Sequence, residues 1–189
     1  MTLITRIQFS YEYDKISKVE YTLYYGRDFH RMVGTVIESS LNLANFKATN
    51  RECVIQALSN KLLNNDCVLK TFPEAILKRE VDFPTGLPTD IPIAIPHAEA
   101  QYCKRAAIAI ATLERPVVFL EMGNPEKELQ VQIVFMLSII NPNSQITWLK
   151  KLTTIFGDTT KLNQLLTASS AETLAEVFKE LIGSNSDSA

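Results

Sequence analysis

His97 is the residue whose type and position are best suited to chemistry. It follows Pro96 at the end of a short apolar run, and the carboxyl ends of strands are where α/β sheets bind ligands. A neutral imidazole keeps one nitrogen unprotonated and nucleophilic near neutral pH, while the other nitrogen donates to a group that fixes the tautomer. His97 is therefore a candidate nucleophile for phosphoryl transfer. The alternative is a half-buried, hydrogen-bonded histidine that merely ends a strand.

The cysteines favour neither a metal site nor a second nucleophile. Cys53, Cys67 and Cys103 lie far apart without CxxC spacing, and their odd number leaves at least one unpaired, as suits a reducing compartment. Cys103 follows His97 by six residues, but no flanking motif supports a cysteine–histidine pair, so we expect a packed thiol. With His30 as the only other histidine, no recognisable ligand spacing arises. We expect neither a metal nor a cofactor.

Length and charge exclude several classes of protein. The chain of 189 residues is 46% hydrophobic and 21% charged, which suits one sizeable core. Its formal net charge of -2 and the lack of a Lys and Arg run disfavour nucleic-acid binding. It contains no stretch approaching ~18 uninterrupted apolar residues, and its first residues lack the pattern of a secretory signal. We therefore expect a cytoplasmic protein that does not insert into the membrane.

The first part of the chain reads as an appendage. Residues 3–13 and 19–24 alternate apolar and polar side chains, and DKIS between them offers a turn, so the pattern predicts a β-hairpin within residues 1–31. An isolated hairpin is marginal in water. The hairpin must pack on the main domain, pair with another chain, or stay mobile.

Two helices are predicted before His97. Thr49 with Glu52 forms a capping box at the start of the first, which continues to about residue 63. Thr71 with Glu74 forms another, and this second helix reaches about Glu80. The proline-rich segment that follows cannot be a helix, and a short strand over residues 91–95 ends at Pro96.

Buried strands and then helices are predicted after His97. Apolar, β-branched runs at residues 106–113 and 129–139 read as buried strands, with a shorter one at 117–120. Ser144 can cap a helix through Phe156, Asp158 can cap a second, and the last helix ends at Gly183. Helices on both sides of a strand-rich centre predict an α/β three-layer sandwich, in which helices flank a mixed central β-sheet.

The segment TGLPTDIPIAIPH, from Thr85 to His97, resembles the signature of the fructose and mannitol class of enzyme IIA components of the bacterial phosphotransferase system. FPTGLPT at residues 83–89 is especially similar to the galactitol-type branch. The similarity in order and spacing extends over residues 32–184. We therefore expect one phosphoryl-carrier domain there, a separate extension at 1–31, and a disordered tail at 185–189.

This resemblance implies a phosphotransferase. The histidine-containing phosphocarrier protein would phosphorylate His97, which would pass the phosphoryl group to a cysteine of an enzyme IIB component. Enzyme IIB would then phosphorylate sugar that enters through the membrane component, enzyme IIC. The sugar implied is galactitol or a related one.

The resemblance also implies roles for three neighbours of His97. Arg79 would steady the phosphoryl oxygens, for which a guanidinium is well shaped. Thr85 would donate a hydroxyl, and Glu99 would orient the ring or interact with a partner. The alternative is that Arg79 is a solvated residue at a helix end, and that Thr85 and Glu99 are loop residues without a role in the site.

One position departs from the pattern of the family. Several members carry a second histidine after the long strand, and Trp148 occupies the corresponding place here. The hydrogen-bond donor that the second histidine would supply is then lost, or is replaced by the indole N–H of Trp148, by Thr147 or by Gln145. This departure fits a galactitol-like subgroup better than a mannitol-like one.

A carrier that meets two partners with one surface should present an exposed His97 ringed by apolar residues. Two alternatives remain. The chain could be a regulatory protein whose phosphorylation state controls a binding partner, or a structural module whose histidine is inert.

Overall fold

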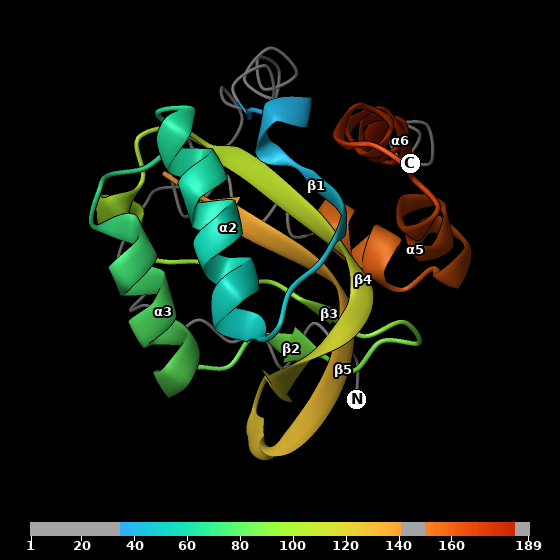
Figure 1. Ribbon diagram of the computed structural model, residues 1–189, viewed down its shortest axis with the longest axis horizontal. Helices are drawn as coiled ribbons and strands as arrows, with labels where there is room; N and C mark the ends of the chain where they lie inside the picture. Colours follow the sequence, from blue (N-terminus) through green and yellow to red (C-terminus); the bar gives the residue numbers. More distant parts are fainter. Residues whose placement is uncertain (1–34, 141–149, 184–189) are drawn as a thin grey trace, which may run out of the picture. The chain divides into compact units, whose positions relative to one another are not determined.

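The computed structural model describes residues 35–140 and 150–183. In this part of the chain, one mixed sheet lies between two groups of helices (Figure 1). The predicted hairpin in residues 1–31 and the tail at 185–189 lie outside the described residues, so both stay predictions. No helix of the described part is long and apolar enough to cross a membrane.

A long antiparallel hairpin forms the centre of the sheet. Strands β4 (Ala107–Glu121) and β5 (Asn124–Ser138) pair from Ala107 opposite Ser138 to Glu121 opposite Asn124. At the turn, Gly123 adopts φ of 81°, a left-handed conformation that glycine adopts without steric cost. The runs predicted at 106–113 and 117–120 are thus one strand, with an irregularity in its register between Thr112 and Val117.

Three short strands complete the sheet. β1 (Leu43–Phe46) runs parallel to β4, and β2 (Gly86–Leu87) pairs with β4 in parallel and with β3 (Ile93–Ala94) antiparallel. β3 in turn runs parallel to β5, which gives the order β1-β4-β2-β3-β5 with additional pairing between β4 and β5. The mixed sheet was predicted, whereas β1 and β2 were not, and β3 is shorter than the expected strand over 91–95.

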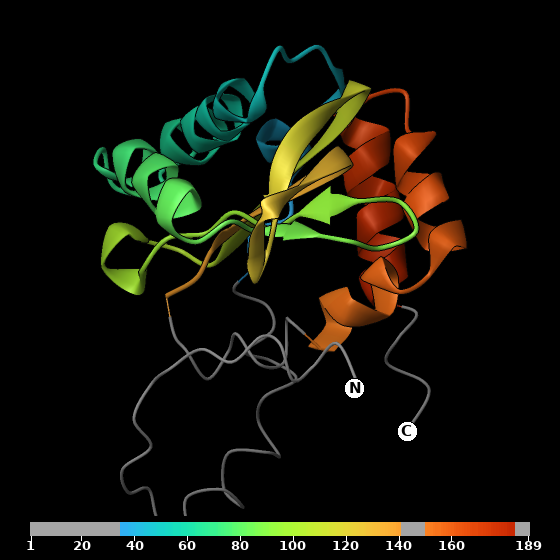
Figure 2. The same cartoon turned by 90° about the horizontal axis from the view of Figure 1, so that it is seen from below.

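Helices cover both faces of this sheet (Figure 2). One layer contains α2 (Arg51–Asn64) and α3 (Phe72–Asp82). The other contains a helical segment at residues 150–156, α5 (Thr159–Leu166) and α6 (Ala171–Gly183). Two short 3-10 helices, η3 (Ser39–Leu41) and η4 (Ala100–Tyr102), lie in the connections. This architecture confirms the predicted α/β sandwich.

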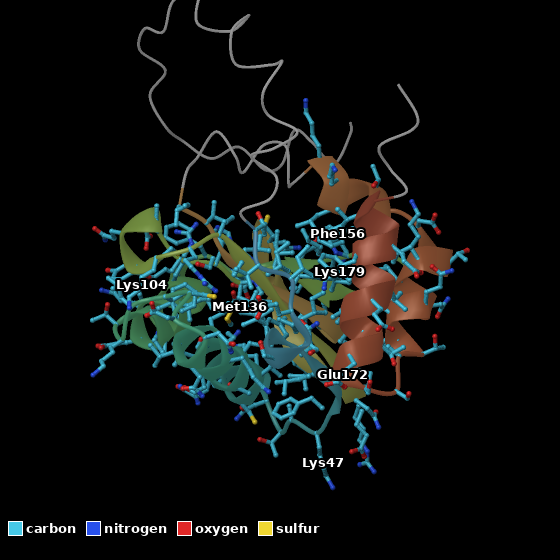
Figure 3. All side chains as sticks on the ribbon, turned by 90° about the horizontal axis from the view of Figure 1, so that it is seen from above. Lys47, Lys104, Met136, Phe156, Glu172 and Lys179 are labelled. Atoms are coloured by element: carbon cyan, nitrogen blue, oxygen red, sulfur yellow. The ribbon has the colours of Figure 1, made fainter. Side chains whose placement is uncertain are left out.

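Alternation along the strands assigns side chains to the two cores. Ala109 and Ala111 of β4 belong to the core under α2 and α3, whereas Ile108 and Ile110 belong to the core under the other layer. Figure 3 labels one residue of each core, Met136 and Phe156, on opposite sides of the sheet. Because both faces are apolar, the hairpin is buried over most of its length, as the continuous apolar runs predicted.

The helix caps confirm the prediction for Asp158 and correct both predicted capping boxes. Asn50, not Thr49, caps α2, because its Oδ1 accepts from the backbone N–H of Cys53 at 2.8 Å. Thr71 occupies the N-cap of α3 without a side-chain capping bond. Asp158 caps α5 as predicted, since its carboxylate accepts from the backbone of Thr160.

Gly86 is a position where backbones approach closely. The β2–β4 contact places Gly86 opposite Glu121, and the Gly86 carbonyl accepts from the Met122 N–H at 2.8 Å. A Cβ atom at position 86 would lie 2.6 Å from the Leu120 carbonyl oxygen. Backbone atoms cannot yield as a flexible side chain would, so this crossing requires glycine.

We predict that Gly86→Ala lowers the free energy of unfolding by about 1–3 kcal/mol, because the added methyl group forces the two backbones apart. Urea denaturation followed by circular dichroism measures the loss. Gly183→Ala is the matched control, since among the described residues no atom outside its own helix backbone and chain neighbours lies within 4 Å of a Cβ there. Equal stability of Gly86→Ala and the native chain would contradict the close approach.

Candidate functional site

His97 lies at the end of the sheet. The Pro96 carbonyl accepts from the Leu137 N–H at 3.1 Å, and His97 forms a parallel bridge with Leu137. His97 thereby extends the line of β3 beside β5. Its relative exposure is only 8%, so the expectation of an exposed histidine is wrong. The backbone pairing draws the residue into the sheet, where its ring lies against protein groups and not in an open loop.

Two contacts give the His97 ring a defined polarity. Nδ1 lies 2.9 Å from the Ile95 carbonyl oxygen. A carbonyl oxygen can only accept, so Nδ1 carries the hydrogen. Nε2 lies 3.2 Å from Nη2 of Arg79, and a guanidinium can only donate. Both contacts therefore select the same neutral tautomer, in which Nε2 has the lone pair.

The surroundings keep the ring neutral. Burial lowers the pKa of His97 below the ordinary value for histidine, and the positive charge of Arg79 lowers it further. The hydrogen bond to Ile95 and the charge of Glu99 act in the opposite direction, but burial is the largest influence. At neutral pH the ring is therefore an uncharged base with a nucleophilic nitrogen.

Arg79 joins the ring to its neighbours. It lies in the last turn of α3, and its side chain is 21% exposed. Nη1 donates to Oε1 of Glu99 at 3.3 Å, and the guanidinium carbon lies 5.3 Å from the centre of the Phe83 ring. Its buried Nε has no hydrogen-bond partner in the described part of the chain. One cation thus contacts the histidine, a carboxylate and an aromatic face.

Thr85 forms a buried pair with Glu80, the residue that follows Arg79 in the chain. Its hydroxyl donates to Oε2 of Glu80 at 2.7 Å, and its backbone N–H donates to Oε1 at 3.0 Å. Both residues are 2% exposed. Burial raises the pKa of Glu80 to about 7, although the two bonds from Thr85 and the charges of Arg51 and Arg79 lower it.

The structure shows where three of the predicted neighbours of His97 lie. Arg79 and Glu99 converge with His97, Glu99 through the arginine, while the hydroxyl of Thr85 is engaged by Glu80. Trp148, Thr147 and Gln145 lie outside the described residues. Sequence reasoning missed Phe83 and the buried Glu80, although a carboxylate next to Arg79 and five residues before a threonine was a usable signal.

Cys103 does not have the setting of a nucleophile. Its Sγ lies 3.8 Å from the Glu99 carbonyl oxygen, and burial raises the pKa of the thiol. A raised pKa keeps the thiol protonated, and only the thiolate is reactive. Within residues 35–140 and 150–183, no three metal-ligating side chains gather into one site.

Taken together, the contacts describe a neutral nitrogen nucleophile beside a guanidinium. Such a pair suits transfer of an anionic electrophile, because the nucleophile attacks while the cation neutralises charge on the transferred group.

Comparison with known proteins agrees with this chemistry. The family model described as "Phosphoenolpyruvate-dependent sugar phosphotransferase system, EIIA 2" matches residues 36–181. The galactitol-specific EIIA component of Escherichia coli K12 is 34% identical over 109 residues, which are 57% of this chain and 70% of that protein. The transcriptional regulator ManR of Bacillus subtilis is 36% identical over 101 residues, which are 53% of this chain and 14% of the regulator.

Solved structures share the fold. The crystal structure of IIA mannitol from Escherichia coli has a TM-score of 0.61 at 21% identity and covers 77% of this chain and 97% of that one. The complex of enzyme IIA and phosphorylated enzyme IIB of the Escherichia coli mannitol system has a TM-score of 0.63 at 18% identity, covering 79% of this chain and 99% of the matched one.

The family match spans both helical layers, the sheet and the whole His97 environment, and it confirms the resemblance in the segment that ends at His97. The chain belongs to the EIIA 2 family of the phosphoenolpyruvate-dependent sugar phosphotransferase system, as one of its phosphoryl carriers.

Proposed function

We propose that His97 is the phosphoryl acceptor and that Nε2 is its reacting atom. The observation that supports this proposal most directly is the 2.9 Å contact between Nδ1 and the Ile95 carbonyl. With Nδ1 committed as a donor, the lone pair of the neutral ring is on Nε2. That nitrogen lies beside the Arg79 guanidinium, where an incoming phosphoryl group needs a positive charge.

In the transfer step, the Nε2 lone pair attacks the phosphorus atom of a phosphohistidine on the donor protein. The donor's N–P bond breaks, and its electron pair returns to the donor ring. The new N–P bond leaves a positive charge on the His97 ring, shared with the Nδ1–H group. Charged donors make stronger hydrogen bonds than neutral ones, so the bond to Ile95 strengthens as the product forms.

Arg79 changes partners during this step. In the resting site Nη2 donates to Nε2, but the phosphoryl group takes that lone pair and brings oxygen acceptors in its place. Phosphoryl transfer mainly requires in-line positioning and neutralised charge from the protein. A guanidinium that shifts its Nη2 donor from the ring to the phosphoryl oxygens helps to position the group and neutralises its charge. Meanwhile Nη1 stays hydrogen-bonded to Glu99.

The two partners are part of this proposal, and the solved complex of an enzyme IIA with a phosphorylated enzyme IIB supports the second of them. The histidine-containing phosphocarrier protein would be the donor, and an enzyme IIB cysteine the acceptor: its thiolate attacks phosphorus, and the N–P electron pair returns to Nε2. Phe83, 63% exposed just after α3, offers an apolar contact for a partner beside Arg79, and Val81, 66% exposed, adds a second apolar side chain at the end of this helix. The similarity to a galactitol-specific component favours galactitol or a related sugar.

A regulatory role is the second candidate. The similarity to part of the transcriptional regulator ManR supports it. In that case the phosphorylated domain would report sugar supply by binding a regulatory partner and would not feed a transporter.

We predict that the chain gains an acid-labile phosphoryl group when it is incubated with phosphoenolpyruvate, the first enzyme of the system and its histidine-containing phosphocarrier. His97→Gln should gain none, because it lacks the nucleophile, whereas His30→Gln is the control and should be labelled like the native chain. Labelling of His97→Gln would contradict the proposal, and an unlabelled native chain would favour an inert histidine. Incubating the labelled chain with enzyme IIB proteins then separates the two roles, since transfer supports the transport carrier and retention with every IIB supports the regulator.

We predict that Arg79→Gln slows phosphorylation about a hundredfold or more, as the loss of one preorganised donor to a developing anion does. The phosphorylation rate of Arg79→Lys should lie between those of Arg79→Gln and the native chain, because lysine keeps the positive charge but lacks the planar guanidinium. Quench-flow labelling measures the rates, with the exposed Arg115→Gln as the control for loss of positive charge. A native rate for Arg79→Gln would show that the cation has no part in the step.

We predict that the His97 ring stays neutral, with its hydrogen on Nδ1, below the pH at which an ordinary histidine is half-protonated. Burial lowers its pKa, so the folded state binds its proton later on acidification than the unfolded chain does. The stability linked to this group is therefore lost as pH falls. A two-dimensional ¹H–¹⁵N titration of the ring nitrogens gives the tautomer and the midpoint, and a midpoint at or above the ordinary value would contradict the burial.

A further inference from the structure

Glu80 is buried and ionisable, yet the transfer step described above does not use it. Its carboxylate accepts from both the N–H and the hydroxyl of Thr85, and neither residue is more than 2% exposed. Burying a carboxylate is costly unless it is fully hydrogen-bonded. A glutamate kept at such a position therefore needs an explanation beyond packing.

The two bonds connect the parts of the fold that carry the reacting groups. Glu80 follows Arg79 in the last turn of α3, whereas Thr85 immediately precedes β2. From Thr85 a chain of backbone contacts continues to the ring: the Thr85 carbonyl accepts from the Ile95 N–H at 3.2 Å, and the Ile95 carbonyl accepts from Nδ1 of His97. One hydrogen-bonded path therefore runs from the helix end that carries Arg79 to the ring of His97.

We propose that Glu80 is a positioning residue of the phosphoryl-transfer site, whose carboxylate ties the helix end bearing Arg79 to the strand segment bearing His97. This inference rests on the proposed function of His97. Its consequence is that the 3.2 Å approach of Nη2 to Nε2 depends on a side chain that touches neither the ring nor the phosphoryl group.

The ionised form of Glu80 performs this role best. A carboxylate accepts both Thr85 donors as charge-assisted bonds, which are roughly twice as strong as neutral ones. On protonation one oxygen becomes a donor, so the Thr85 hydroxyl must reverse, and both bonds become neutral. Burial places the pKa of this carboxyl at about 7, with Arg51 of α2 and Arg79 of α3 as the charged groups that lower it. Protonation near neutral pH therefore loosens the tie.

Four variants separate the parts of this tie. Glu80→Gln keeps the shape and both contacts but cannot ionise, and Glu80→Ala removes both. Thr85→Val removes the hydroxyl but keeps the backbone donor, and Thr85→Ser restores the hydroxyl. Glu74→Gln is the matched control, because Glu74 is an exposed carboxylate on the same helix.

The test measures the single-turnover rate of phosphorylation from the phosphocarrier between about pH 6 and pH 8.5, a range that spans the titration of a group with a pKa near 7. The phosphorylation rate of the native chain should fall on acidification, with an inflection near pH 7. Glu80→Gln should show, at every pH, the low rate that the native chain has at acidic pH. Glu80→Ala should be roughly tenfold to a hundredfold slower, as misplaced reacting groups cause. Thr85→Val should lie between, with Thr85→Ser and Glu74→Gln near native.

The measurements distinguish failure of this inference from failure of the proposed function. If the native chain is not phosphorylated at His97, the proposed function fails. If it is phosphorylated, but Glu80→Gln and Thr85→Val keep the native rate and its inflection, Glu80 is not a positioning residue. Because Glu80→Ala can lose stability, the ¹H–¹⁵N spectrum of His97 in folded Glu80→Gln is a second readout, in which a native ring environment at every pH would also overturn the inference.

Discussion

The hydrogen bond from Nδ1 of His97 to the carbonyl of Ile95 is the interaction on which the proposed chemistry of this protein depends. It assigns the lone pair of the ring to Nε2 by occupying the other nitrogen. The carbonyl is itself fixed, because the N–H of Ile95 pairs with Thr85 and the next carbonyl, that of Pro96, pairs with Leu137 of β5. The sheet therefore acts as a template that selects one tautomer of one side chain.

Burial and charge act together on this ring. Removing the imidazole from water favours its neutral form, and the Arg79 guanidinium at Nε2 favours it further. The same cation compensates for the charge that a phosphoryl group would bring. With a relative exposure of 8%, the ring is largely removed from water, which is the condition that favours its neutral form.

Much of the fold was predictable from the sequence because the signals were long. The apolar runs that became β4 and β5 could be buried only between two helical layers, and Asp158 had the chemistry of a cap. β1 and β2 escaped prediction because they have four and two residues and exist through pairing with β4. Asn50 took the cap expected of Thr49 because an adjacent asparagine oxygen fits the same helix start.

The site was predictable in its members more than in its geometry. The motif ending at His97 and the arginine at the end of a helix indicated two side chains that the structure places in contact. The burial of the ring did not follow from the motif, because it depends on the pairing of Pro96 with Leu137, 41 residues further along the chain. The role of Thr85 was likewise hidden, since its hydroxyl points to Glu80 only once α3 and β2 are packed together.

The central claim is that Nε2 of His97 is the nitrogen that receives the phosphoryl group. A two-bond ¹H–¹⁵N correlation spectrum of the phosphorylated protein identifies the nitrogen bonded to phosphorus. The account predicts a phosphoryl group on Nε2 with the hydrogen still on Nδ1. A phosphoryl group on Nδ1 would contradict it, because the bond to Ile95 would then have to break.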